Sequence, residues 1–217
     1  MPCHSYIFFD ISSSIHTLSD ATLRGAKTAC VKLCNVQTKV QIEAFGTLGF
    51  KAGTRFMLHV RAENAAHIQE FVRDFVHSKL GKHLKVSYTL FGMRRPSPYN
   101  PKQTLPEEHE MNGRYLIVYP FVKTIEWHLI PHEKRASIMK DHVVVGRKFT
   151  STISQLLLYS YGLDDQEFIV SYATDSLQDF QTLVMELRNT EARRHTERDT
   201  PIYLCTRLTL ADAFNLI

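Results

Sequence analysis

Hydrophobic and polar residues follow two kinds of pattern along the chain, and the first hundred residues contain both. Alternating or β-rich apolar positions predict strands at residues 6–11, 40–46, 55–61 and 84–91. Helices are predicted at residues 20–34 and 65–80, the second with a buried stripe of Ile68, Phe71, Val72, Phe75 and Val76. The expected order of elements in this half is therefore β-α-β-β-α-β.

The same order occurs again in the last hundred residues. Strands are predicted at residues 114–122, 153–161, 168–173 and 202–208, with one helix at residues 131–148 that begins at a favourable proline. A further helix is expected after an N-cap at Asp175 or Ser176, with an apolar stripe of Leu177, Phe180, Leu183, Val184 and Leu187. The chain thus reads as a repeat of one supersecondary unit.

A segment rich in proline separates the two halves. It reads RRPSPYNPKQTLPEEHEMNG, and its four prolines and its acidic run do not continue regular structure. We expect an N-terminal ferredoxin-like half at residues 1–93, a linker at 94–113 and a C-terminal ferredoxin-like half at 114–217. The predicted fold class is α+β, with the two halves packed sheet to sheet as in a dimeric α/β barrel, because each sheet has one face without helices to cover it.

Composition and charge narrow the classes of partner. With 44% hydrophobic residues, the 217-residue chain can bury a substantial core. The net charge of +4 is spread over segments of mixed sign, and the densest basic run, residues 193–198, lies among acidic residues. This distribution argues against a nucleic-acid partner but suits an anionic ligand. Since no run approaches the roughly 20 apolar residues of a membrane span, we expect a soluble, cytoplasmic protein without one.

The four cysteines, Cys3, Cys30, Cys34 and Cys205, form no CxxC pair and have no closely spaced histidine of the zinc-binding type. Cys30 and Cys34 alone lie near each other, one helical turn apart. Cysteines at this spacing in an apolar stretch are typical of core packing. The pattern agrees with a reducing cell interior.

His142 is the strongest candidate for chemistry in the second half. It lies on the predicted helix with Ile138 and Met139 on neighbouring turns and Gly146 one turn later. A glycine at i+4 leaves room for a planar ligand beside the imidazole, and a neutral imidazole is a normal axial ligand of haem iron. Judged from the residues alone, the alternative is a structural histidine, one of the eleven in this chain.

Four stretches of the second half closely resemble the chlorite dismutase superfamily: YPFVKTIEW, PHEKRASIMKDHVVVGRKF, SYGLDDQEFIVSYATDSLQDFQTLVMELRNTEARR and DTPIY. The resemblance is dense over residues 114–207 and looser over residues 92–99. It implies that His142, within an M-x-x-H-x-x-x-G segment that also contains Met139 and Gly146, is the proximal ligand of a haem iron. It also implies a homopentamer.

Two positions depart from the chlorite dismutases. Thirteen residues after the proximal histidine those enzymes resemble one another in presenting a distal arginine, and this chain has Gln155. A neutral amide can hydrogen-bond peroxide or water but does not supply the fixed positive charge that an anionic substrate favours. Where the family has a glutamate that supports the proximal histidine, this chain has Ala192, with Glu191 beside it.

Gln155 makes the chain resemble instead the coproheme decarboxylases, which use peroxide to convert two propionates of coproheme to vinyl groups. In their Y-P-x-x-K motif the tyrosine is taken to bear the radical and the lysine lies near the reacting propionate; Tyr119 and Lys123 stand here at that spacing. Arg188 matches a family arginine that contacts propionates. Taken singly, these would be a strand tyrosine, a surface lysine and a helix-terminal cation.

The linker contributes the remaining candidates. The looser part of the resemblance adds Ser97 and Tyr99 to the residues expected to contact the cofactor, and Arg94 and Arg95 are candidates for a further propionate contact. These cations would face carboxylates if the linker folds over the mouth of the pocket.

The leading hypothesis is an oxidoreductase that decarboxylates iron-coproporphyrin III to haem b in haem synthesis. In it Tyr119, Lys123 and Gln155 are the catalytic residues, and the bound group is haem b or iron-coproporphyrin III with its iron on His142. Hydrogen peroxide is the oxidant. Two alternatives remain: a chlorite dismutase that converts chlorite to chloride and dioxygen, and a haem-binding or sensing protein without turnover.

Overall fold

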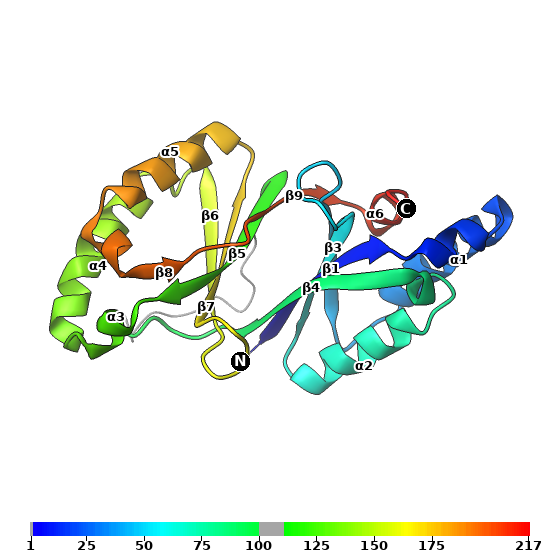
Figure 1. Cartoon of the computed structure of the whole chain (residues 1–217), viewed down its shortest axis with the longest axis horizontal. Helices are drawn as coiled ribbons and strands as arrows, with labels where there is room; N and C mark the ends of the chain where they lie inside the picture. The colour runs from blue at the N-terminus through cyan, green and yellow to red at the C-terminus, as the bar shows by residue number, and fades with distance from the viewer. Residues whose placement is uncertain (1, 100–110) are drawn as a thin grey trace. The chain divides into compact units, whose positions relative to one another are not determined.

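The computed structural model describes residues 2–99 and 111–217, which form two compact units. Unit 1 comprises Met1–Arg94 and Tyr203–Ile217, and unit 2 comprises Arg95–Ile202. Most of the linker expected at residues 94–113, namely residues 100–110, lies outside the described residues. Each unit is an α+β structure built on an antiparallel sheet (Figure 1).

Unit 1 has the predicted β-α-β-β-α-β order. Its elements are β1 (Cys3–Ile11), η1 (Ser13–Thr17), α1 (Asp20–Asn35), β2 (Gln41–Gly46), β3 (Phe56–Ala62), α2 (Ala65–Val76), η2 (Gly81–His83), β4 (Leu84–Met93), β9 (Tyr203–Leu208) and α6 (Leu210–Phe214). The strands pair antiparallel in the order β4-β1-β3-β2-β9. Strand alternation and helical periodicity therefore located every main element of this half to within a few residues.

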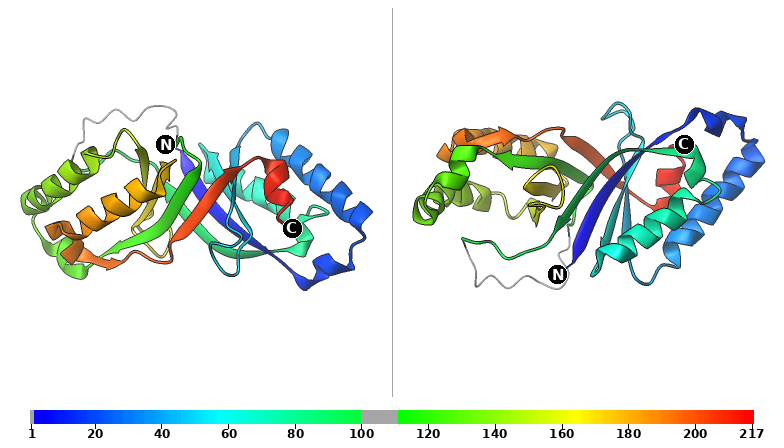
Figure 2. Two further views of the ribbon diagram at one scale, coloured as in Figure 1. Left: turned by 90° about the horizontal axis from the view of Figure 1, so that it is seen from above. Right: turned by 60° about the horizontal axis from the view of Figure 1, so that its bottom comes forward.

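Helices α1 and α2 cover one face of this sheet (Figure 2) and enclose the core of unit 1. Phe9 of β1 stacks on Phe56 of β3 with ring centroids 5.0 Å apart. The stripe predicted on α2 is buried at Ile68, Phe71 and Phe75. Cys30 and Cys34 of α1 are free thiols buried in the same core, which confirms that they serve packing.

The other face of the unit 1 sheet carries a buried charged network. His4 Nδ1 lies 3.0 Å from His59 Nε2, and His59 Nδ1 lies 3.3 Å from Glu43 Oε2. Glu43 also pairs with Arg61 at 3.4 Å and with Arg207. Burial, and then the nearby charge of His59, lower the pKa of His4 to about 2. Because burial disfavours the charged form of both imidazoles and outweighs the effect of the Glu43 carboxylate, the pair is held uncharged at neutral pH.

Unit 2 repeats the order with small additions. Its elements are β5 (Tyr115–Lys123), α3 (Ile125–Leu129), α4 (His132–Arg147), β6 (Ile153–Tyr159), β7 (Phe168–Thr174), α5 (Leu177–Arg188), η3 (Glu191–His195) and β8 (Thr196–Arg198). The strands pair antiparallel in the order β6-β7-β5-β8. The pattern had not predicted α3 or β8, because five and three residues are too short to show a period.

Helices α4 and α5 cover one face of the unit 2 sheet (Figure 1). Val145 and Phe149 at the end of α4 and Leu183 of α5 pack there against Ile153 and Val170 of the strands. Helix α5 begins after Ser176, whose side chain accepts a hydrogen bond from the Asp179 N–H at 3.1 Å, so the second of the two predicted N-caps is the one used. The candidate site lies on this face of the sheet.

The closing strand differs from the expected boundary. The sequence pattern assigned residues 114–217 to one half, but β9 and α6 belong to unit 1. The reason is that β9 pairs with β2, with Phe45 opposite Arg207, while Phe214 of α6 packs in the first core against Phe56. The last strand that pairs within unit 2 is β8, where Val122 lies opposite Arg198.

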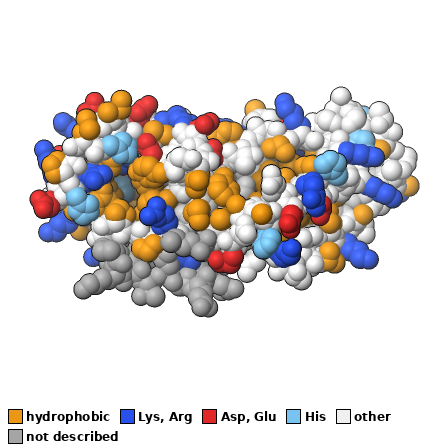
Figure 3. Space-filling model, turned by 90° about the horizontal axis from the view of Figure 1, so that it is seen from below, with side chains coloured by type: hydrophobic (Ala, Val, Ile, Leu, Met, Phe, Trp, Pro, Cys, Tyr) orange, Lys and Arg blue, Asp and Glu red, His pale blue; other side chains and the backbone are white. Residues whose placement is uncertain are grey.

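On the face drawn in Figure 3, the basic side chains of the described residues lie dispersed among acidic and neutral ones. The mixed-sign sequence thus produces a mixed-sign surface on this face. Within the described part of the chain, no helix is long and apolar enough to cross a membrane.

Candidate functional site

Helix α4 directs His142 toward the side of unit 2 where the sheet lies. Ile138, one turn before, packs on Trp127, and Val145, one turn after, packs on the strands, so the imidazole between them lies on the same side of the helix. Burial, and then the charge of Lys123, lower the pKa of His142 to about 4. The imidazole is therefore neutral at physiological pH, with a nitrogen lone pair free to bind a metal.

Gly146 leaves space one turn beyond His142. A Cβ built on Gly146 would meet no atom within 4 Å, whereas a Cβ on Gly81 would lie 1.9 Å from the Phe75 carbonyl oxygen. Packing within this chain thus requires a glycine at position 81 but not at position 146. The open space beside α4 agrees with the predicted approach of a planar ligand.

Gln155 occupies the covered face of the sheet and is nevertheless exposed. On β6 it stands between Ile153 and Leu157, which point to the same face and pack in the core beneath α4 and α5. An exposed polar side chain at this place means that the helices do not close over the middle of the sheet. The described side chains of unit 2 thus leave Gln155 exposed on the face of the sheet toward which α4 directs His142.

Tyr119 on β5 joins Gln155 through a residue that the sequence analysis did not single out, Tyr172 on β7. Gln155 Nε2 donates a hydrogen bond to Tyr172 Oη at 3.3 Å, and the hydroxyls of Tyr119 and Tyr172 are hydrogen-bonded to each other. Burial is the main reason that the pKa of Tyr119 is raised well above that of a free phenol. Tyr119 is accordingly a protonated phenol at neutral pH.

Lys123 lies on the histidine side of this face. Its side chain is only 8% exposed, and its ammonium lies 4.3 Å from the Trp127 ring centroid and 5.2 Å from that of Phe121. Burial lowers its pKa to about 8, while the charge of Glu167 acts in the opposite direction. The structure therefore places the lysine of the motif close to His142, where its charge acts on the imidazole.

The start of the linker lies on unit 2. Ser97 is hydrogen-bonded to the phenol of Tyr159 on β6. Tyr99 packs on the Trp127 cluster and stacks on His132 of α4 with ring centroids 5.4 Å apart. Arg95 lies over the Tyr159 ring at 6.0 Å. Of the two linker arginines, only Arg95 belongs to this unit, since Arg94 is buried in unit 1.

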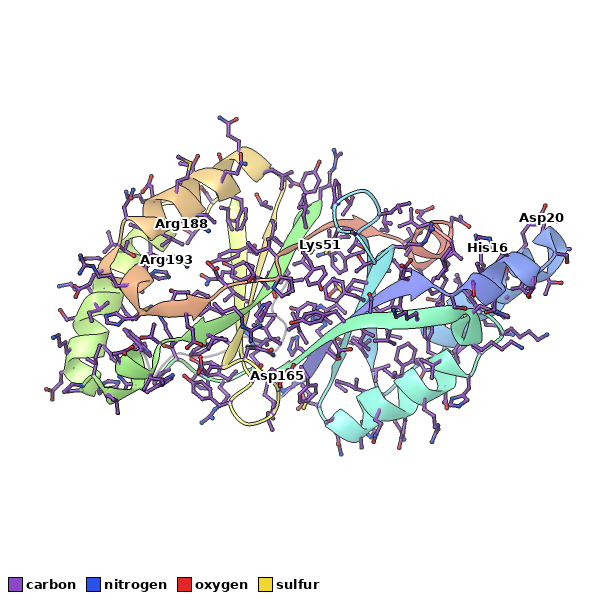
Figure 4. The ribbon with its side chains drawn as sticks, viewed as in Figure 1. His16, Asp20, Lys51, Asp165, Arg188 and Arg193 are labelled. Atoms are coloured by element: carbon purple, nitrogen blue, oxygen red, sulfur yellow. The ribbon has the colours of Figure 1, made fainter. Side chains whose placement is uncertain are left out.

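Arg188 ends α5 beside an acidic residue. Its Nη2 lies 4.0 Å from Asp199 Oδ2, and Arg193 Nη1 lies 2.7 Å from the same oxygen. Figure 4 shows Arg188 and Arg193 near each other at this end of α5. The charges of Asp199 and Arg188 both act on Tyr119, in opposite directions. A surface hollow of about 480 Å³ at this end of α5 is lined by Arg188, Asn189, Thr190, Glu191, Arg193 and Arg194. The guanidinium of Arg188 is more than half exposed and accessible to a carboxylate.

Position 192 carries no charge near the histidine. Ala192 in η3 is buried against Trp127 and Ile138, and Glu191 is exposed. Among the described residues, the charged group that acts on His142 is a cation, Lys123.

The family model of chlorite dismutase matches residues 21–208, which is most of the chain. The chain belongs to the chlorite dismutase family. A coproheme decarboxylase from Mycolicibacterium smegmatis is 29% identical over 169 residues, covering 76% of this chain and 72% of that protein. A chlorite dismutase from Ideonella dechloratans is 28% identical over 178 residues, covering 77% of this chain and 62% of that protein.

Solved structures show the same fold. A mutant chlorite dismutase from Candidatus Nitrospira defluvii superposes with a TM-score of 0.91 at 25% identity, covering 99% of this chain and 94% of that one. The chlorite dismutase of the same organism in complex with imidazole gives a TM-score of 0.90 with the same coverage. The predicted α+β class with two ferredoxin-like halves is thus confirmed for this member of the chlorite dismutase family.

Two polar residues of this family member's site were missed by sequence reasoning, Tyr172 and Asp199. The alternation of strand 168–174 places Tyr172 on the face of Phe168 and Val170, which is a weak signal, since a strand tyrosine is ordinary. Asp199 is one of the acidic residues around the basic run at residues 193–198, a context that does not indicate a site. Only the folded chain brings either of them to Tyr119.

Proposed function

We propose that this chlorite dismutase family member binds an iron porphyrin in unit 2 with His142 as the single protein ligand of the iron. The described residues contain no group of three or more side chains that could hold a bare metal ion, whereas porphyrin iron needs one axial donor. The neutral imidazole, the open side of Gly146 and the exposed Gln155 fit such a group.

We further propose that the reaction is peroxide-dependent decarboxylation of iron-coproporphyrin III to haem b, with the iron porphyrin as substrate. Relatives named for two reactions match at 29% and 28% identity, so overall similarity does not choose between them. The observation that carries the choice is Gln155, a neutral amide linked by hydrogen bonds to the buried phenol of Tyr119. Neutral peroxide needs no fixed cation at that place, whereas chlorite favours one.

The overall reaction balances for each of the two propionates. One propionate side chain and one hydrogen peroxide give a vinyl group, carbon dioxide, water and hydroxide. The side chain loses two electrons, a proton and carbon dioxide, and the peroxide accepts the two electrons. When bound, the iron porphyrin supplies the redox centre that peroxide oxidises.

In this proposal the protein residues bind and orient the substrate. Tyr119 is oxidised first, and its protonated phenol loses a hydrogen in that step. The oxidised Tyr119 then removes a hydrogen from the propionate side chain. Arg188 and Lys123 bind propionate carboxylates, the first from an exposed position and the second as a buried cation with a pKa of about 8. Ser97 and Tyr99 border the porphyrin from the linker, and Gln155 binds peroxide or water.

The test uses purified chain, iron-coproporphyrin III and stepwise additions of peroxide, followed by absorbance and by mass spectrometry of the porphyrin. We expect the mass of the porphyrin to fall in two successive steps, each the loss of one carbon dioxide and two hydrogen atoms. A His142→Ala control should show neither step. A Tyr119→Phe variant should bind the porphyrin and leave its mass unchanged, while Tyr115→Phe on the same strand should behave as the parent. Binding without any change of mass in the parent would instead support a haem-binding protein without this turnover, and dioxygen release from chlorite would support the chlorite dismutase alternative.

A further inference from the structure

Three polar side chains form a line across three neighbouring strands of unit 2. Tyr119 lies on β5, Tyr172 on the central strand β7 and Gln155 on β6. The register pairs Gln155 directly with Tyr172, and it pairs Tyr172 with Ile117, two residues before Tyr119. Because directly paired residues and residues two apart point to the same face, all three side chains face α4 and α5.

Tyr172 is placed among apolar residues. Its side chain is 4% exposed, and it packs with Ile153, Val170 and Leu183, while the Phe180 ring lies 5.3 Å away. A buried hydroxyl without hydrogen bonds is unfavourable, and a phenylalanine would fill nearly the same volume. Packing therefore accounts for an aromatic ring at this position but not for its hydroxyl.

The hydroxyl of Tyr172 is hydrogen-bonded to Gln155 and to Tyr119, which are both residues of the proposed site. A phenol has one hydrogen and two lone pairs, and one lone pair accepts the Gln155 amide N–H. Burial is the main reason that the pKa of each phenol is raised, that of Tyr172 to about 12; the bond between them raises the pKa of Tyr119 further and acts in the opposite direction on Tyr172, as expected when Tyr119 donates the hydrogen. The oxygen of Tyr172 thus accepts from both neighbours and fixes the direction of both.

We propose that Tyr172 is a positioning residue, whose hydroxyl holds the Gln155 amide and the Tyr119 phenol in a single hydrogen-bonded chain. For the chemistry this rests on the function proposed above, because it couples the group assigned to peroxide with the group assigned to the propionate. The chain of hydrogen bonds itself belongs to the protein without substrate. Removal of the hydroxyl should leave porphyrin binding intact and slow turnover.

The first experiment needs no substrate. The full chain is labelled with 3-fluorotyrosine, and the ¹⁹F resonance of Tyr119 is identified as the one missing from Tyr119→Phe. In Tyr172→Phe we expect that resonance to shift and the pKa of Tyr119 to fall, because a hydrogen-bond acceptor has been removed. The matched control is Tyr203→Phe, which removes the hydroxyl of a tyrosine in unit 1 that is 5% exposed, and it should leave the resonance in place.

A Tyr119 resonance and titration identical in the parent and in Tyr172→Phe would overturn the proposal, whatever the protein catalyses. Gln155→Leu provides a second variant in case Tyr172→Phe fails to fold, and it should shift the Tyr119 resonance through Tyr172. If Gln155→Leu leaves that resonance unmoved, the chain of hydrogen bonds is not formed.

The second experiment measures turnover of iron-coproporphyrin III with peroxide. Tyr172→Phe should lower kcat about tenfold, the effect of one lost neutral hydrogen bond, with KM for the porphyrin unchanged. A raised KM with unchanged kcat would contradict positioning, since it would mean that the hydroxyl serves binding alone. If the parent does not decarboxylate the porphyrin, the proposed function fails and the ¹⁹F experiment alone decides the role of Tyr172.

Discussion

Gln155 lies exposed on β6 and hydrogen-bonds Tyr172, so a substitution at this one residue changes the charge of the site without opening the core. An amide donates and accepts hydrogen bonds but carries no net charge, whereas a guanidinium is cationic at every accessible pH. Under the proposed function, the residue at this position selects between a neutral and an anionic oxidant. The rest of the site is already basic, with Lys123 buried near His142 and Arg188 at the end of α5.

Gln155→Arg should make the protein more active toward an anion. We expect dioxygen release from chlorite to rise by about tenfold or more over the parent, the effect of one charge-assisted hydrogen bond to the substrate. The measurement is an oxygen-electrode assay of the porphyrin-loaded protein, with Gln155→Leu as a control for the loss of the amide alone. Equal dioxygen release from Gln155→Arg and Gln155→Leu would show that charge at this position does not select the oxidant.

At the scale of elements, α4 serves two purposes along its length. Ile138 and Val145 fix the helix to its neighbours, His142 carries the candidate ligand, and a Cβ on Gly146 would meet none of the described atoms within 4 Å. Glycine in a helix interior costs stability because its unfolded state is more flexible and it packs nothing. At position 146 the missing side chain leaves room one turn from His142, as the proposed porphyrin binding requires.

Gly146→Leu should raise the stability of the protein and weaken its binding of the porphyrin. The protein without porphyrin is expected to gain about 0.5–1 kcal/mol in its free energy of unfolding, because leucine is the better helix former. Affinity for iron-coproporphyrin III, measured by Soret titration, should fall because the side chain enters the open space. The control is Gly25→Leu in α1, where a Cβ would likewise meet no atom within 4 Å, and there only the stability gain is expected. Unchanged affinity in Gly146→Leu would mean that the porphyrin does not approach this face of α4.

At the scale of the whole molecule, the two units share an order of elements but differ in chemistry. Unit 2 carries the proposed site, whereas unit 1 carries the buried network of His4, His59 and Glu43. Burial raises the pKa of Glu43, but hydrogen bonds from His59 and Arg207 and the charge of Arg61 outweigh it and hold the pKa at about 2. His4, His59 and Glu43 therefore bind fewer protons in the folded chain than in the unfolded chain.

The stability of unit 1 should consequently fall in acid. The ordinary histidine pKa of 6.5 applies in the unfolded chain, and that of folded His4 is about 2. Between these values the unfolded state binds more protons, so this contribution is complete above pH 6.5 and is lost progressively as the pH falls toward 2. His4 alone should account for about 2 kcal/mol of unfolding free energy between about pH 7.5 and about pH 5.

Urea unfolding of the full chain at those two pH values measures this change. His4→Phe keeps a ring in the same place and should flatten the pH dependence, whatever its effect on stability at neutral pH. An equal dependence in the parent and in His4→Phe would show that His4 is not held neutral by the fold.

We also predict that five copies of the chain assemble, as the family resemblance implies. Several large apolar side chains on the helices of unit 2 are exposed, among them Ile125 at 72%, Leu129 at 78% and Met185 at 69%. Apolar surface of this kind is more often covered in an assembly than left in water. Light scattering at micromolar concentration should give five times the mass of one chain, and the mass of a single chain would contradict the prediction.

Local pattern determined the elements and their order. Period-two and period-3.6 burial, proline and N-cap signals located the two β-α-β-β-α-β repeats, because each depends only on residues a few positions apart. The motif around His142 likewise needed only local spacing, and it indicated both the candidate ligand and the glycine beside it.

Tertiary structure decided what those elements bring together. Tyr172 meets Tyr119 and Gln155 because β7 pairs with both β5 and β6 in one register, and β9 joins unit 1 because it pairs with β2. Strand register and partner choice depend on side chains far apart in the chain, and no periodicity within a single strand encodes them. The sequence by itself therefore determined which residues could do chemistry, and the pairing of strands decided which of them act on one another.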